Sequence, residues 1–191
     1  STVNFGTGIT VNTTTVNSTT QITASITITA AAVTGARSVS VTNALPGGGT
    51  ATLTDAFTVN NPIPTLITVT PAVGIPGQTL NVVLVGTNYI SDASTVDFGA
   101  GITVNTTTVN SATQITASIT ISGSATTGAR NVTVTNALPG GGTATRTSGF
   151  TVNNPVPTIA SILPVSGEKF QTLDVVLTGT NYVAGSTVNF G

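Results

Sequence analysis

Apolar and polar residues alternate strictly over several short stretches of this chain. In Gln114–Ile121, three isoleucines and Ala117 alternate with threonine and serine, which is the period-two pattern of a half-buried strand. Similar segments predict further strands at Thr65–Thr70, Thr95–Phe98, Ile102–Val109 and Ala129–Thr135. No window shows the apolar period of an amphipathic helix. The pattern therefore predicts an all-β fold.

One predicted strand is apolar on both sides. Leu80, Val82 and Leu84 are expected to face a core. Val83 and Val85 point to the opposite side, and a strand with two apolar sides favours one that is covered on both faces.

Glycine and proline mark the turns between these segments. Pro76-Gly77 predicts a turn, and Leu138–Gly142 predicts a hairpin loop because its glycines tolerate positive φ. Phe150 and Val152 lie on a last strand. About seven short strands at regular turn spacing are typical of an antiparallel β-sandwich.

A hexapeptide occurs three times. STVNFG at Ser1–Gly6 returns as STVDFG at Ser94–Gly99 and as STVNFG at Ser186–Gly191, with a period of about 93 residues. That period is the size of an independently folding small domain. The sequence predicts three segments: 1–61 as the C-terminal part of a repeat, 62–154 as a complete repeat, and 155–191 as the N-terminal part of a further repeat. On this interpretation the chain is cut within a domain at both ends.

The predicted segments meet at short proline-containing linkers. Pro62-Ile63-Pro64 and Pro155-Val156-Pro157 are expected to be semi-rigid. Successive sandwiches would therefore form a stiff rod.

Composition excludes several functions. Only 5% of residues are charged, against about 25% in ordinary proteins, and the formal net charge is −1, so no electrostatic case exists for nucleic acid or an anionic membrane. The apolar runs are too short for membrane insertion. Cysteine and histidine are absent, which excludes disulfides and Cys/His metal sites. No cofactor is expected.

The few charged residues do not predict catalysis or a repeated metal site. No carboxylate recurs at one repeat position, which argues against repeated calcium sites. Glu168 and Asp174 flank a turn and a strand instead of a cleft, and a serine nucleophile would lack its histidine base. We expect no enzyme activity. Arg37 and Arg130, the only repeated charge, are interpreted as solvated residues at a strand start.

Residues 62–154 resemble the IPT/TIG immunoglobulin-like family. The resemblance rests on Pro64 with Pro71, on Gly86–Tyr89 followed by Ser94–Gly99, on Thr113–Ile115 and on Gly149–Val152. It implies tandem Ig-like antiparallel β-sandwiches, which in this family serve as spacers, interaction modules and accessory domains of polysaccharide enzymes. The basic DNA-contacting loops of some members have no match here.

The incomplete terminal repeats leave two alternatives. Either the chain is a window on a longer array, or strands complete the halves between chains, head to tail. Candidate inter-chain strand contacts are Val3, Phe5, Val188 and Phe190. Ser186–Gly191 duplicates Ser1–Gly6 and would compete for the same position, which favours the longer array.

Threonine and serine line one predicted strand face. The residues are Thr23, Ser25, Thr27 and Thr29. This is either ordinary β-propensity on a hydrated face or a lateral contact face between neighbouring rods, since natural sheet edges usually carry protective charge and these hardly do.

These observations favour a structural role. We expect a subunit or segment of an extracellular or cell-surface microbial filament, stalk or sheath, whose partner is a further copy of itself or a neighbouring repeat. The alternative is an adhesin stalk or a polysaccharide-binding accessory module, although no sequence feature supports a polysaccharide ligand.

Overall fold

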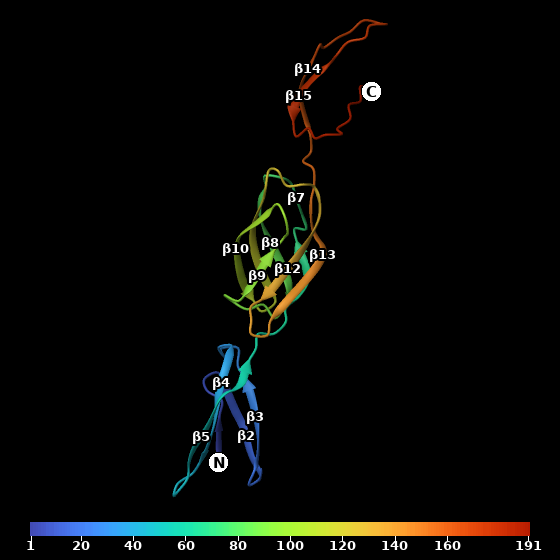
Figure 1. The fold of residues 1–191 in the computed structure, drawn as a ribbon. Coiled ribbons are helices and arrows are strands. Elements are labelled where there is room, and N and C mark those ends of the chain that lie inside the picture. Colours follow the sequence, from blue (N-terminus) through green and yellow to red (C-terminus); the bar gives the residue numbers. More distant parts are fainter.

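The computed structural model describes all residues from 1 to 191, arranged as three bodies in a row (Figure 1). Residues 1–61 lie at one end, 62–154 in the middle and 155–191 at the other end. Every regular element is a β-strand, so the predicted all-β class is confirmed. No helix is present that is long and apolar enough to cross a membrane.

The middle body, called here the middle sandwich, consists of two four-stranded sheets. One has the order β10-β11-β8-β6, with β10 at Ile102–Ser111, β11 at Gln114–Ile121, β8 at Thr79–Thr87 and β6 at Thr65–Thr70. The other has the order β7-β13-β12-β9, with β7 at Val73–Gly74, β13 at Gly142–Val152, β12 at Gly128–Asn136 and β9 at Ser94–Asp97. All pairings are antiparallel except that of β7 with β13.

The core of the molecule lies between these two sheets. All 15 residues of the buried apolar cluster fall between Val69 and Val152. The alternation along β11 has the predicted effect, because Ile115, Ala117, Ile119 and Ile121 are all 0% exposed. Phe98, directly after β9, and Phe150 of β13 meet edge to face with ring centroids 5.5 Å apart. Both rings are fully buried in the core.

Strand β8 corrects one prediction. Val82 and Leu84 are fully buried as expected, but Val85 is exposed and Val83 only half-buried. The strand lies between β11 and β6 within its sheet, and no third layer covers the outer side. The prediction of two covered faces was wrong, because valine on a hydrated face satisfies β-propensity without burial.

Residues 1–61 repeat the later strands of the middle sandwich. Strands β1 (Thr2–Asn4), β4 (Gly35–Asn43) and β5 (Gly49–Val59) form a three-stranded sheet. Strands β2 (Ile9–Ser18) and β3 (Gln21–Ile28) form a separate pair. These five strands correspond to β9 through β13, and the register is preserved: Val3 lies opposite Val41 as Val96 lies opposite Val134. Residues 1–61 contain no counterpart of β6, β7 or β8.

Residues 155–191 contain the missing counterparts of β6 and β8. Strands β14 (Thr158–Leu163) and β15 (Val176–Thr180) pair antiparallel. Thr158 lies opposite Thr180, as Thr65 lies opposite Thr87 in the middle sandwich. Ser186–Gly191 forms no strand here. We call residues 155–185 the C-terminal hairpin.

The linker at residues 60–64 is fixed to the sandwich that follows it. The Asn61 N–H donates to Pro139 O at 2.8 Å, and the Asn61 carbonyl accepts from the Gly141 N–H at 2.7 Å. The Asn61 side chain donates to Ala137 O at 2.8 Å. These bonds hold the linker against the β12–β13 loop, so its stiffness comes from hydrogen bonds as well as from proline.

Candidate functional site

The N-terminal body exposes an incomplete core. Phe5, Val39, Val41 and Phe57 line a hollow of about 460 Å³. We call it the N-terminal hollow. The counterparts of these four residues in the middle sandwich are all 0% exposed, because the β6–β8 sheet covers them. The hollow is therefore one half of a sandwich core whose second layer is missing.

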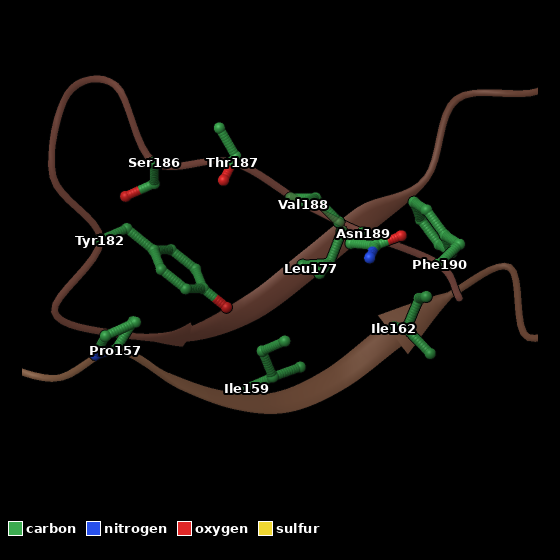
Figure 2. A pocket seen from close by; sticks show the side chains of 10 residues that line it. All are labelled: Pro157, Ile159, Ile162, Leu177, Tyr182, Ser186, Thr187, Val188, Asn189 and Phe190. Atoms are coloured by element: carbon green, nitrogen blue, oxygen red, sulfur yellow. The ribbon is translucent and has the colours of Figure 1, made fainter.

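The C-terminal body exposes the complementary half. A hollow of about 610 Å³ lies between the C-terminal hairpin and Ser186–Gly191, with Ile159, Leu177, Tyr182 and Phe190 facing into it (Figure 2). We call it the C-terminal hollow. Ile159 is 66% exposed and Phe190 69% exposed. The middle-sandwich counterpart of Tyr182 is Tyr89, which is buried. Leu177 and Tyr182 of the hairpin are thus counterparts of core residues without an opposite sheet, whereas Phe190 repeats Phe5 and belongs to the other half.

Each half also has an open strand edge. Strand β11 lies between β10 and β8, but its counterpart β3 pairs only with β2. Strand β8 lies between β6 and β11, but its counterpart β15 pairs only with β14. Backbone groups on one edge of β3 and one edge of β15 therefore face no strand, and such edges are templates for pairing with another strand.

A buried asparagine depends on both halves. Asn136 is 2% exposed; its side chain accepts from Ser94 Oγ at 2.6 Å and donates to Pro62 O and Asn88 O, both at 2.8 Å. Its counterpart Asn43 accepts from Ser1 Oγ in the same way but is exposed. The counterparts of Pro62 and Asn88 are in the C-terminal hairpin.

The four predicted inter-chain contact residues do not come together. Val3 pairs with Val41 in the same chain, and Phe5 packs edge to face on Phe57 with centroids 5.4 Å apart. Val188 and Phe190 border the C-terminal hollow at the opposite end (Figure 2). The first pair thus has partners within the chain, and the second pair is largely exposed.

The predicted threonine and serine face lies on the outer side of β3. Thr23, Ser25 and Thr27 are exposed, and Asn17 and Asn12 of β2 donate to the Thr23 and Thr27 hydroxyls. Thr29 lies just beyond the end of β3, and its hydroxyl donates to Gly8 O at 3.0 Å. Thr29 is therefore not part of the strand face.

Arg130 is a loop-fixing residue that sequence reasoning missed. Its guanidinium donates to Ala100 O at 3.1 Å and to Thr126 O at 2.5 Å. These bonds connect the β9–β10 and β11–β12 loops. Interpretation of this arginine as a solvated residue was wrong, because its partners are backbone carbonyls that no sequence pattern indicates. Arg37 makes a similar bond to Val33 O.

Tyr89 is buried and its hydroxyl has no hydrogen-bond partner. Burial raises the pKa of Tyr89 from 10.0 to about 12 because the ionised phenolate would lose its hydration. No group of three or more His, Cys, Asp or Glu side chains is placed to hold a metal ion.

The middle sandwich is similar to a known domain type. Residues 63–139 match the family model of quinohemoprotein amine dehydrogenase, alpha subunit domain III, which is a β-rich domain of immunoglobulin-like type. The match runs from the linker through β12 and covers about two fifths of the chain. No curated protein matches the chain. The middle sandwich is accordingly an all-β sandwich that is similar to this Ig-like-type domain.

Proposed function

We propose that this chain is a structural subunit or segment of an extracellular microbial filament, stalk or sheath built from tandem Ig-like repeats. One observation carries the proposal: the two ends of the molecule expose complementary halves of the sandwich that stands complete between them. A molecule with this arrangement extends in one direction by repeating a single joint.

The repeats are assigned within this proposal to the IPT/TIG type, with 62–154 as a complete repeat and 1–61 and 155–191 as parts of two others. Gly86–Tyr89 followed by Ser94–Gly99 supports the assignment, and Gly179–Tyr182 followed by Ser186–Gly191 repeats it. Tyr89 belongs to the buried apolar cluster, which gives that motif a packing role.

Stiff joints support the filament reading. The Asn61 bonds bind the linker to the sandwich that follows, so bending at this joint would break several hydrogen bonds together. A stiff joint preserves direction from one repeat to the next. The scarcity of charge permits close lateral packing of neighbouring rods.

Electron microscopy of the native material tests this function. We expect long regular filaments whose axial spacing per sandwich is about 35–40 Å, the length of an 11-residue strand such as β13 with its turns. Isolated short rods would contradict the filament function.

The second candidate is an accessory or stalk module of a larger protein, such as an adhesin or a polysaccharide-binding protein. The observation that favours it is the match to a domain of an enzyme subunit, in which one Ig-like-type domain is part of a larger assembly. Short rods carrying a distinct globular end would support this candidate.

A further inference from the structure

We propose that the C-terminal hairpin of one copy completes the N-terminal body of a second copy, by adding β15 to the free edge of β3. This inference rests on the proposed function and specifies its joint. The middle sandwich is the template for this joint. In it, the counterparts of β3 and β15, which are β11 and β8, are paired within one chain.

The template fixes the register of the joint. Strand β11 pairs with β8 so that Ile115 lies opposite Leu84, Thr116 opposite Val83 and Ser118 opposite Asn81. The sequence of β3 is identical to that of β11. The corresponding inter-chain pairs are Ile22 with Leu177, Thr23 with Val176, and Ser25 with Asp174.

The hairpin carries the side chains that the N-terminal hollow lacks. Val82 and Leu84 of β8 are 0% exposed in the core. Their counterparts Val175 and Leu177 have the same residue types and are only half-buried in the C-terminal body. Docking brings them onto Val41 and Phe57, so two exposed half-cores become one closed core.

The joint also supplies missing hydrogen bonds. By the template, the Asn43 amide donates to Pro155 O and Asn181 O of the other copy, as Asn136 donates to Pro62 O and Asn88 O. Asn154 then meets the loop that ends at Gly49, as Asn61 meets the loop that ends at Gly142. Both joints of the rod become equivalent.

The two halves within residues 1–191 cannot close on each other. The two halves lie at opposite ends of the middle sandwich (Figure 1), whose strand β13 alone is 11 residues long, about 36 Å. The linker between β13 and β14 has five residues and spans at most about 18 Å. The proposal therefore assigns the contact to two copies, head to tail, which produces open filaments.

The exposed area is sufficient for such a joint. The chain exposes 11911 Å², whereas a compact monomer of 18.8 kDa exposes about 8,300 Å². The difference, roughly 3,600 Å², arises partly from the elongated shape. Obligate interfaces bury about 2,000–5,000 Å².

The duplicated hexapeptide does not block the joint. Strand β1 lies beside β4, in the sheet opposite the one that receives β15. Ser186–Gly191 would occupy that same position, so one of the two identical segments is displaced. We assign the position to Ser1–Gly6, which already pairs with β4 in the native register.

Cysteine cross-linking of the full chain tests the register. The chain has no cysteine, so Thr23→Cys combined with Val176→Cys introduces two outward-facing thiols that the template places opposite each other. The matched control is Thr23→Cys with Thr178→Cys, on the same face but two residues out of register. We expect a ladder of disulfide-linked multimers for the first pair only. Absence of a ladder from the first pair, or equal ladders from both, would overturn the proposal.

A mixing experiment tests the direction. Ile22→Asp disables the receiving edge, and Leu177→Asp disables the donating hairpin; neither touches the middle sandwich, whose circular dichroism serves as the folding control. Each variant alone should associate at least about 100-fold more weakly than the wild type, while a mixture of the two should form dimers that grow no further.

The outcomes of these experiments distinguish failure of the proposed joint from failure of the proposed function. A wild-type chain that stays monomeric during sedimentation, or a mixture that forms no dimer, would overturn the joint even if native filaments exist. A segment preceding residue 1 would then be the better occupant of the β3 edge. Conversely, a confirmed joint with no native filaments would contradict only the proposed function.

Discussion

Strands β3 and β11 have the same eight residues but different surroundings. In β11 the four inward residues are 0% exposed. In β3 the counterparts Ile22, Ala24 and Ile26 are half-buried, and Ile28 is 47% exposed. On one side, β11 pairs with β10, and β3 pairs in the same register with β2, the counterpart of β10. The difference arises on the other side, where β8 is present for β11 and absent for β3.

This comparison separates local structure from burial. Alternating residues and turn residues are enough to form the same hairpin in both regions, as β10–β11 and as β2–β3. The dry core forms only once, where a second sheet lies opposite. Hydrophobic stabilisation scales with the apolar area removed from water, about 25 cal/mol per Å², so the middle sandwich holds most of the folding free energy of this chain.

The largest expected effect comes from separating the regions. Residues 62–154 expressed alone should unfold in one cooperative thermal transition, because they contain both sheets and the whole buried cluster. Residues 1–61 alone should show no such transition. Calorimetry on both fragments measures this, and a cooperative transition in the shorter fragment would contradict the assignment of its open core.

Truncation of one aromatic ring in each region should give unequal losses. Phe150→Ala removes a fully buried ring and should lower the free energy of unfolding by about 3–5 kcal/mol. Phe57→Ala removes a half-buried ring and should cost less than about 2 kcal/mol. Native-state hydrogen exchange of β11 and β3 amides reports each region separately. Equal costs would mean that the N-terminal hollow is already covered.

Asn136 and its exposed counterpart Asn43 allow the same comparison for a polar side chain. Asn136→Ala leaves the Pro62 and Asn88 carbonyls without a donor and should destabilise the middle sandwich by about 1–3 kcal/mol. Asn43→Ala, at an exposed site, should change stability by less than about 0.5 kcal/mol in the isolated chain. Denaturant titration measures both, and a large effect of the second substitution at high concentration would indicate association.

Tyr89 makes stability depend on alkaline pH. The folded-state pKa is about 12 against 10.0 for the exposed side chain. Between these values the unfolded state binds fewer protons, so the stabilisation is complete below pH 10 and decreases as pH rises towards 12. The melting temperature of the wild type should therefore fall more steeply over this window than that of Tyr89→Phe. Parallel slopes for the two proteins would refute the role of this hydroxyl.

The smallest effect is expected on the outer face of the sheet. The Thr120 hydroxyl bonds with Asn105 and Thr79, both at 2.9 Å, whereas Thr27 bonds only with Asn12. Thr120→Ala should therefore cost about 1 kcal/mol and Thr27→Ala less than about 0.5 kcal/mol. Thermal melts compare the two substitutions. Equal losses would show that the bond contributed by β8 is unimportant.

Sequence reasoning predicted the strands well because their signals are local. The alternation in Gln114–Ile121 and the glycines of Leu138–Gly142 define a strand and a hairpin without reference to the rest of the fold. The prediction that Val85 is covered was wrong, because a period-two pattern does not indicate whether one or both faces of a sheet are covered. Sequence reasoning failed at Arg130 because the acceptors are carbonyls of two loops that meet only in the folded chain.

The candidate site was only partly accessible to sequence. Repetition of the hexapeptide indicates where Val188 and Phe190 fall within the repeat, and it predicts them as contact residues. The open edges of β3 and β15 and the role of Asn43 depend on which strands are neighbours in space. Strand order is set by long-range pairing, which the local patterns in this sequence do not encode.

The parallel pairing of β7 with β13 bears on how the rod responds to tension. Thr151 N–H donates to Ala72 O and Asn153 N–H donates to Gly74 O, each at 2.8 Å. A force along the rod pulls β7 from its N-terminal side and β13 from its C-terminal side. Because the two strands run parallel, that force slides one past the other and loads both hydrogen bonds at once instead of peeling them one by one. The two-residue strand β7 therefore adds resistance to extension out of proportion to its length.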